Sequence, residues 1–179
     1  VNDDQFAFYA EKLDELMQRY LHGYRKTILD HGAGEGNIAL KLRAVYNNGG
    51  KVAVSEMFEK YRNIMNEKGL TVYDAKDLPE NAFDGIYMNC AFYYIHPKKW
   101  KSEIGRLLKS LKDGGYLFLT DVPTVKKIPI LHKNLNGFRK FLVCTFERMT
   151  TVYQFDLGGF FVDEKKIKKW FPETVVEDE

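Results

Sequence analysis

The sequence predicts an α/β fold in which a mostly parallel sheet is covered by helices on both faces. Short apolar segments alternate with amphipathic segments of helical period about five times between residues 26 and 123, a pattern typical of parallel strands joined by helices. The first apolar segment leads into a turn with three alternating glycines, and a helix pattern follows. This order predicts a ligand-binding loop at the start of a helix.

The composition predicts one globular domain over residues 1–179, with 45% hydrophobic and 29% charged residues. A net charge of +2 gives no strong field for nucleic acid or an anionic membrane. Cys90 and Cys144 lie far apart without ligand-like spacing to a histidine, so we expect no disulfide framework, no metal site and a reducing compartment. We see no signal peptide and no apolar run of membrane-spanning length, roughly 20 residues. Cytoplasmic localisation is the resulting expectation.

The first half of the chain is expected to begin with an amphipathic helix that packs over the sheet edge or the mouth of the site. The next segments alternate between strand and helix patterns. Asn47–Gly50 is a strong turn signal, and Gly69 is a helix stop. The expected elements are a helix over residues 4–22, a strand over 26–30, a helix over 37–45, a strand over 52–55, a helix over 58–67 and a strand over 70–73.

The second half continues the alternation and becomes less regular after residue 123. We expect Asp113-Gly114-Gly115 to end a helix, Gly158-Gly159 to break a strand or flap, and Asp163 to cap a short helix. One helix face should carry Trp100, Ile104, Leu107, Leu108 and Leu111. The expected elements are a strand over 83–89, a helix over 97–111, a strand over 116–120, a helical segment over 130–149, a strand or flap over 151–155, a helix over 164–170 and a sixth strand over 174–176.

The glycine turn at Gly32-Ala33-Gly34-Glu35-Gly36 allows positive φ angles and a close approach of a ligand to the backbone. Glu56 follows at the end of the second strand, where it could accept hydrogen bonds from ribose hydroxyls. Residues 34–39 also satisfy the G-x-G-x-x-A form of dinucleotide enzymes. However, Asp30 closes the first strand two residues before Gly32, where it would repel a pyrophosphate and attract an ammonium group.

Further motifs follow in a fixed order: Asp74-Ala75 before Leu78-Pro79, Phe83-Asp84-Gly85-Ile86 leading to Asn89-Cys90, and a turn from Leu108 to Gly115. With the acid-x-G-x-G-x-G run, they resemble class I S-adenosylmethionine-dependent methyltransferases of the small, type 11-like group. The resemblance covers residues 26–123, with Asp113 where the family's L-K-P-G-G turn has proline. It implies a Rossmann-like fold and S-adenosylmethionine as cofactor.

The resemblance also implies residue roles. Asp30 would support the cofactor's amino group, Glu56 would bind the ribose, and Met57 would pack beside the adenine. Asp74 would accept from the adenine amino group while the Ala75 amide faces a ring nitrogen, and the backbone near Asn89 and Cys90 would border the methionine amine and the sulfonium. The implied cofactor-binding residues are Asp30, Gly32, Ala33, Gly34, Glu56, Met57, Asp74, Ala75 and Asn89.

Candidate catalytic residues follow the fourth and fifth strands, where α/β sheets bind ligands. They are Tyr94, His96 and Asp121, with Tyr93 and His132 nearby. His96 has the intrinsic pKa of a general base, but His-Pro before a helix is also a plain cap. Tyr94 could stack on the acceptor, line the sulfonium pocket or serve packing. We expect His22 and His31 to be structural or incidental, with His31 able to face solvent.

The methyl acceptor is expected to be a small molecule or a glycan precursor. An aromatic and basic segment over residues 138–161 would suit a flat or anionic acceptor, and residues 1–22 with 145–160 could form a compact lid, although packing alone also explains this composition. Residues 124–179 would form an acceptor-side cap and the last strand. For the family's final strand hairpin two alternatives stay open: a truncated C-terminus that leaves it incomplete, or a sheet that is completed differently. The alternatives are an NAD-linked oxidoreductase and a catalytically inactive cofactor-binding partner subunit. An oligomer is compatible with all of these interpretations.

Overall fold

The computed structural model describes residues 3–21, 26–46, 50–122, 152–153 and 159–175 of the 179. The chain divides into two compact units. The first consists of residues 1–91 and 105–120, and the second of residues 92–104 and 121–179. The expected single domain stays a prediction.

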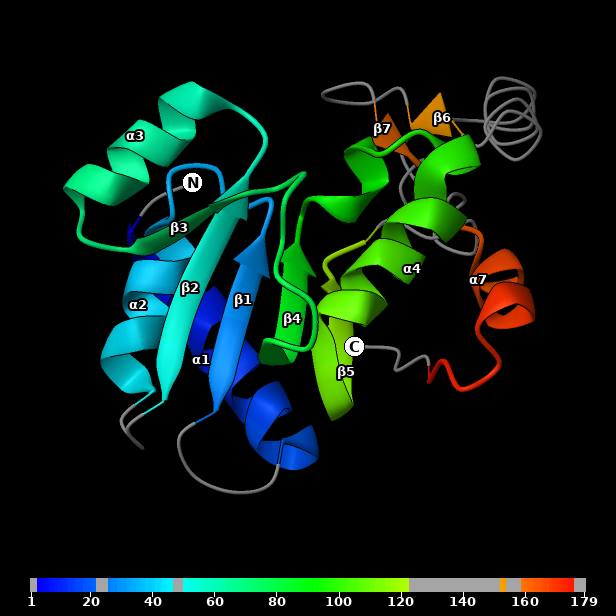
Figure 1. Cartoon of the computed structure of the whole chain (residues 1–179), viewed down its shortest axis with the longest axis horizontal. Helices are drawn as coiled ribbons and strands as arrows, with labels where there is room; N and C mark the ends of the chain where they lie inside the picture. Colours follow the sequence, from blue (N-terminus) through cyan, green and yellow to red (C-terminus); the bar gives the residue numbers. More distant parts are fainter. Residues whose placement is uncertain (1–2, 22–25, 47–49, 123–151, 154–158, 176–179) are drawn as a thin grey trace, which may run out of the picture. The chain divides into compact units, whose positions relative to one another are not determined.

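The first unit is built on a five-stranded parallel sheet, as predicted (Figure 1). The strand order is β3-β2-β1-β4-β5, so the strand that precedes the glycine turn lies at the centre of the sheet. All five strands end at the same edge, which brings the ends of β1, β2 and β3 side by side. The strands are β1 (Thr27–His31), β2 (Lys51–Glu56), β3 (Thr71–Asp74), β4 (Phe83–Asn89) and β5 (Leu111–Thr120).

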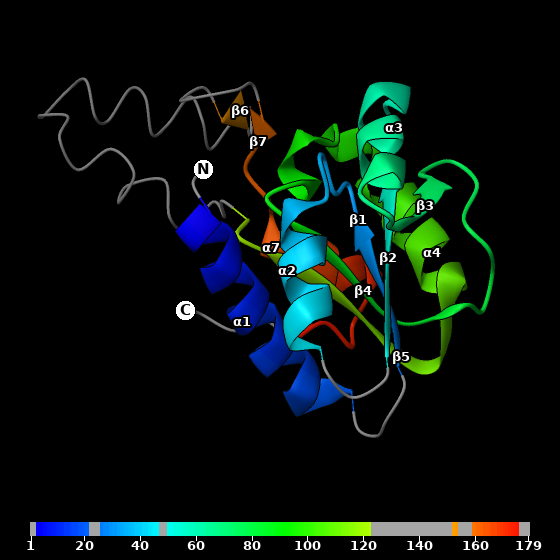
Figure 2. The ribbon, with the colours of Figure 1, turned by 90° about the vertical axis from the view of Figure 1, so that its left-hand side faces the viewer.

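One face of this sheet is covered by α1 (Asp3–Tyr20) and α2 (Asn37–Val45), which lie side by side in Figure 2. The core of the unit lies here, because Leu13 and Met17 of α1 and Leu42 of α2 pack with strand residues such as Ile28. Met65 of α3 (Glu59–Glu67) belongs to the same cluster. The leading helix therefore joins the core, and a lid role for it stays a prediction.

The opposite face of the sheet carries the alternate residues of each strand. His31 of β1 contacts Arg106, which lies in the C-terminal half of α4 (Trp100–Ser110) and belongs to this unit. Successive strand residues point to opposite faces, so Ile28 and Asp30 face α1 and α2 while Leu29 and His31 face α4. At the end of β1, one face of the sheet therefore carries the carboxyl group of Asp30 and the other carries the imidazole of His31.

The junction of α4 and β5 differs from the prediction. The helix ends at Ser110, and Leu111 already pairs with Phe83 of β4, so Asp113-Gly114-Gly115 forms an irregularity inside β5 rather than a helix stop. A Cβ added at Gly115 would lie 2.9 Å from the Asp84 carbonyl oxygen, which explains a glycine at this point. On the predicted helix face, Leu108 is 40% exposed, whereas the other four residues are buried.

The second unit contains the N-terminal half of α4 and the segment before it. The predicted start at Pro97 is a 3₁₀ turn, because α4 begins only at Trp100. The buried Trp100 ring lies 5.5 Å from the Phe92 ring, and its indole N–H donates to the Ile95 carbonyl oxygen at 2.8 Å. The elements are η1 (Phe92–Tyr94), η2 (Pro97–Lys99), β6 (Val152–Tyr153), β7 (Gly159–Phe160) and α7 (Glu164–Trp170).

The C-terminal part confirms some predictions and corrects others. Asp163 caps α7 by accepting from the backbone N–H groups of Lys165 and Lys166, as expected. The expected strand over 151–155 is observed at Val152–Tyr153 (β6), and Gly159, expected to end it, starts β7, which pairs antiparallel with β6. The sixth strand over residues 174–176 is wrong at Thr174 and Val175, because the Thr174 N–H and hydroxyl both donate to the Phe171 carbonyl oxygen and close a turn. The predicted helical segment 130–149, most of the aromatic segment 138–161, most of the lid segment 145–160, His22 and His132 lie outside the described residues.

Candidate cofactor site

The glycine turn connects the end of β1 to the start of α2, as the sequence predicts. Gly32, Gly34 and Gly36 have φ angles of 78°, 56° and 74°, which only glycine adopts without strain. The loop is attached to the end of β2, since the Gly32 and Ala33 N–H groups donate to the Ser55 carbonyl oxygen at 2.9 and 3.2 Å. A Cβ added at Gly34 would meet no atom within 4 Å, so the backbone of the turn is bare at that point.

Glu56 ends β2 and links the turn to the second strand. Its Oε2 accepts from the Gly34 N–H at 3.0 Å, and its Oε1 accepts from the N–H groups of Met57 and Phe58 at 2.7 and 3.3 Å. The residue is 8% exposed, and three backbone donors satisfy its buried charge without a cation. Because a carboxylate accepts about four hydrogen bonds, Oε2 keeps capacity for a ligand hydroxyl.

Asp30, at the end of β1, is the most perturbed carboxyl group of the site. Burial raises its pKa to about 7; the nearby Tyr87 hydroxyl opposes this rise, and the charge of Glu56 adds to it. Tyr87 lies directly opposite Asp30 in the β1–β4 pairing, fully buried, and its hydroxyl forms no hydrogen bond of ordinary geometry. A buried carboxyl group beside such a hydroxyl is poised to ionise when a cationic ligand group arrives.

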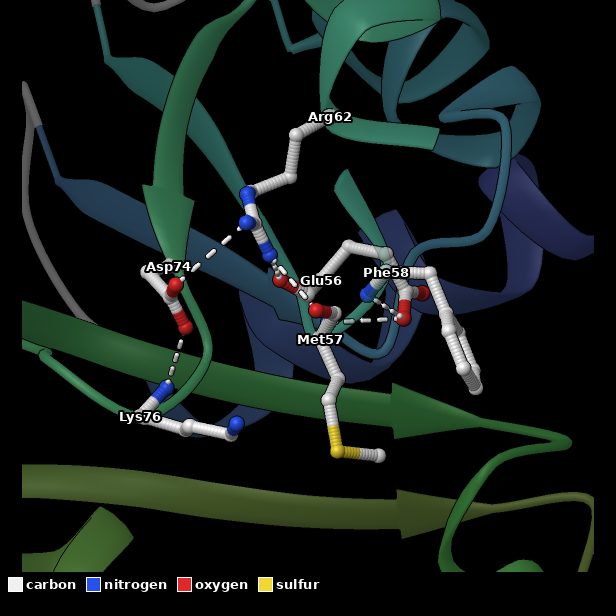
Figure 3. Close-up of polar contacts among 6 residues, drawn as sticks. All are labelled: Glu56, Met57, Phe58, Arg62, Asp74 and Lys76. Atoms are coloured by element: carbon white, nitrogen blue, oxygen red, sulfur yellow. Dashed lines mark hydrogen bonds and ion pairs between the residues drawn. The ribbon is translucent and has the colours of Figure 1, made fainter. Parts of the chain in front are cut away.

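Asp74 ends β3 opposite Glu56 in the β2–β3 pairing, and Figure 3 shows the polar contacts around both. Its Oδ1 accepts from the Lys76 N–H at 2.9 Å, and its Oδ2 lies 3.4 Å from Nη2 of Arg62. The Ala75 N–H donates to the Glu56 carbonyl oxygen at 3.2 Å, and the Met57 side chain is exposed. The residues expected to contact an adenosine are thus held next to one another.

The end of β4 is tied to the end of β5. The Thr120 hydroxyl donates to Asn89 Oδ1 at 2.9 Å, and the Cys90 N–H donates to the Thr120 carbonyl oxygen at 3.2 Å. Cys90 has a φ angle of 52°, which is uncommon for a residue with a side chain and is often found at functional sites. A Cβ added at Gly32 would lie 3.0 Å from that of Ala91, so the glycine turn and the end of β4 are in contact.

The expectation that His31 could face solvent is wrong, whereas its contacts agree with the expected structural role. The residue is 4% exposed, its Nδ1 lies 2.7 Å from the Ser55 hydroxyl, and its Nε2 lies 3.4 Å from Nη2 of Arg106. Because arginine only donates, Nε2 accepts and Nδ1 carries the proton that is donated to Ser55. The reason for the error is that β1 continues one residue further than predicted, which places His31 inside the sheet rather than on the loop.

The predicted catalytic residues Tyr94, His96 and Asp121 belong to the second unit. The Tyr94 hydroxyl lies 3.4 Å from that of Tyr93, and the Tyr94 side chain is half exposed. His96 caps the turn at Pro97, because its Nδ1 accepts from the Lys98 N–H at 3.2 Å. Asp121 is exposed and has a φ angle of 50° directly after β5. These contacts leave the proposed roles untested.

Sequence reasoning missed Arg62, Tyr87 and Thr120. Arg62 lies six residues after Glu56 on a helix rich in other charged residues, and no local pattern distinguishes it. Tyr87 fits the apolar pattern of a buried strand, so the sequence indicates only packing for it. Its hydroxyl, which lies opposite Asp30, was the one feature that could have indicated a further role. Thr120 ends a strand in the same way as Asn89, and that shared position could have indicated it.

A family model described as a methyltransferase domain matches residues 2–170. No curated protein matches the sequence. The chain therefore belongs to the methyltransferase domain family. The predicted membership of the S-adenosylmethionine-dependent methyltransferases is confirmed, with S-adenosylmethionine as the cofactor of the class.

Solved structures confirm the fold. The chain is similar to the PH0226 protein from Pyrococcus horikoshii OT3 (TM-score 0.65, 15% identity, covering 92% of this chain and 79% of that one). It is also similar to the plantazolicin methyltransferase BpumL in complex with SAH (TM-score 0.59, 14% identity, covering 83% and 58%). The third is coclaurine N-methyltransferase bound to N-methylheliamine and SAH (TM-score 0.51, 17% identity, covering 61% and 34%). The chain thus spans just over half of the second protein and a third of the last.

No helix among residues 3–21, 26–46, 50–122 and 159–175 is long and apolar enough to cross a membrane. The same part of the chain holds no cluster of three or more His, Cys, Asp or Glu residues suited to a metal ion. The cytoplasm and a metal-free reaction stay predictions.

Proposed function

We propose that this protein transfers the methyl group of S-adenosylmethionine directly, by in-line displacement and without a metal, to a small molecule or a glycan precursor. The single observation that carries the proposal is the arrangement of Asp30, Glu56 and Asp74 at the ends of three neighbouring parallel strands, beside a bare glycine turn. These carboxylates are the acceptors that an ammonium group, a ribose and an adenine amine require.

The residues present fit the cofactor. Glu56 has hydrogen-bonding capacity left at Oε2 for a ribose hydroxyl, in addition to the Gly34 N–H. Asp30 would accept a hydrogen bond from the amino group of the methionine part, and the Tyr87 hydroxyl could then donate to the ionised carboxylate. Gly32, Ala33 and Gly34 would line the loop with backbone alone.

At the adenine end, Asp74 would accept from the exocyclic amine while the exposed Met57 side chain covers the ring. The Ala75 N–H donates to Glu56 in this structure, so a ring nitrogen would share that donor.

For the transfer step, the bound sulfonium supplies an activated methyl group, and the protein's part is to position and to shield. Asn89 and Cys90, held by Thr120, would border the reacting sulfur with their backbone. Tyr94 would line the acceptor side, and Asp121 or His96 would take a proton where the acceptor carries one. While His96 accepts from Lys98 at Nδ1, its neutral ring has the proton on Nε2, so a role as base requires that contact to break.

The small-molecule acceptor is supported by the likeness to coclaurine N-methyltransferase, which is bound to N-methylheliamine and SAH. We place the protein in the cytoplasm, without a nucleic-acid partner, because of its two distant cysteines and its small net charge.

Calorimetry with S-adenosylmethionine, S-adenosylhomocysteine and NAD tests the proposal. The wild type should bind both sulfur compounds and not NAD, and Glu56→Ala should lose at least about tenfold in affinity, because a buried acceptor for the ribose is removed. Binding of NAD alone would exclude the proposal in favour of an oxidoreductase. Tight cofactor binding without turnover on a panel of metabolites would favour the inactive partner subunit. Full activity in His96→Ala would exclude that histidine as the base.

A further inference from the structure

Arg62 on α3 is the one side chain drawn in Figure 3 that contacts the ends of both β2 and β3. Its Nη1 donates to the carbonyl oxygens of Glu56 and Met57 at 2.9 and 2.6 Å, and its Nη2 lies 3.4 Å from Asp74 Oδ2. The guanidinium is a rigid fork with several donors in one plane. It therefore fixes the relative position of the turn after Glu56 and the carboxylate of Asp74.

The Asp74 carboxylate is held at both oxygens. The Lys76 N–H binds Oδ1, and Arg62 faces Oδ2, so the plane of the carboxylate is set by two contacts from different elements. Its side chain is nevertheless 42% exposed, and two of its acceptor positions are not used by these contacts. Asp74 is thus pre-organised to accept from a ligand rather than to be neutralised inside the fold.

We infer that Arg62 is a positioning residue that makes the site selective for adenine, by holding Asp74 so that an exocyclic amine is accepted and a carbonyl at the same place is rejected. The inference rests on the proposed function, in which Asp74 faces the six-position of the base. A purine with a carbonyl there presents lone pairs to a carboxylate, and neither group gains a partner. A carboxylate free to rotate would turn away from that carbonyl and discriminate less.

The size of the effect follows from the cost of an unmet hydrogen bond. Leaving one acceptor unpaired against another lowers affinity by about 10- to 100-fold. We therefore expect wild-type protein to prefer S-adenosylhomocysteine over its deaminated analogue, S-inosylhomocysteine, by a ratio of dissociation constants in that range. Without Arg62, the ratio should fall towards one.

The experiment is calorimetry of both compounds on wild type, Arg62→Met, Arg62→Lys and a control, Arg43→Met. Arg43 is a matched arginine of the first unit that donates to a backbone carbonyl, that of Gly69, at 2.9 Å. Arg62→Met should reduce the ratio at least about fivefold, while Arg43→Met should keep it. Arg62→Lys should also reduce it, because the ammonium is a point charge on a flexible stem and lacks the rigid planar fork that fixes the carboxylate relative to the backbone. The Arg62→Lys variant also keeps the test decisive if Arg62→Met does not fold.

A double variant separates positioning from a general structural effect. If Arg62 acts through Asp74, then Asp74→Asn should lower the ratio by itself, and Arg62→Met added to it should lower it no further. Equal weakening of both compounds in both Arg62 variants, with the ratio unchanged, would overturn the inference and leave the proposed function intact. Wild-type protein that binds neither compound would overturn both.

Discussion

Replacing Asp30 by asparagine should stabilise the fold at neutral and alkaline pH. The carboxyl group is 4% exposed, and burial raises its pKa from 3.8 to about 7. Folding therefore opposes ionisation of this group. Asparagine has nearly the same shape and no charge to bury, so the variant tests the electrostatic cost separately from packing.

The magnitude and its sign follow from proton linkage. In the unfolded chain Asp30 loses its proton near pH 3.8, whereas in the folded chain it keeps the proton until about pH 7. The folded state binds more protons in that window, so the contribution of Asp30 to stability becomes more unfavourable as pH rises through it and is constant above it. At about 1.4 kcal/mol per pKa unit, Asp30 lowers the free energy of unfolding by roughly 4 kcal/mol at pH 8 and by about 1.5 kcal/mol at pH 5.

The assay is urea unfolding of the wild type and Asp30→Asn between pH 5 and pH 8.5, with Asp77→Asn as an exposed control. The advantage of the Asp30 variant should grow by about 2.5 kcal/mol across this range, and the control should show no such trend. The variant should also bind S-adenosylmethionine more weakly, by about tenfold or more, because a charge-assisted contact is lost. A difference in stability that does not change with pH would refute the reasoning.

Two further predictions concern the same unit. Gly36→Ala should lower the free energy of unfolding by about 2–4 kcal/mol, since φ is 74° and the new Cβ would lie 2.7 Å from Leu70 Cδ1. Gly34→Ala, with a positive φ but open space, should cost only about 1–2 kcal/mol; equal losses in urea titrations would contradict the packing argument. Burial alone would raise the pKa of Asp84, but the Thr27 N–H and the nearby ammonium groups of Lys112 and Lys26 outweigh it and hold the pKa below its usual value. Asp84→Asn should therefore be less stable than wild type at pH 7, with the difference closing as pH falls below the unfolded pKa of 3.8; parallel curves would count against it.

The sequence predicted the order of the elements well because each strand and helix has its own local period and punctuation. The boundary errors arose where pairing across the sheet decides. Leu111 looks like the last apolar position of a helix, yet pairing with Phe83 places it in β5. Thr174 was misassigned for a different reason, because its turn depends on local hydrogen bonds to Phe171 that β-propensity does not report.

Within the site, the glycines and the three strand-end carboxylates were predictable because their spacing follows from one strand–turn–helix unit after another. The residues that tune them were not. Arg62 lies on α3 and contacts Asp74 at the end of β3, and Tyr87 lies on β4 opposite Asp30 of β1. Nothing in the sequence around either residue indicates these contacts. His31 was misjudged by a single residue of strand length.

That single residue has a wider consequence. On β1 and β2, neighbouring side chains point to opposite faces of the sheet. Asp30 and Glu56 lie on the face covered by α1 and α2, whereas His31 and Ser55 lie on the face of α4. An insertion of one residue in either strand would exchange the two sets, because the side-chain period of a strand is two. The chemistry of this edge is thus encoded in whether each strand has an odd or an even number of residues before its acid, a property that substitutions leave untouched and insertions or deletions destroy.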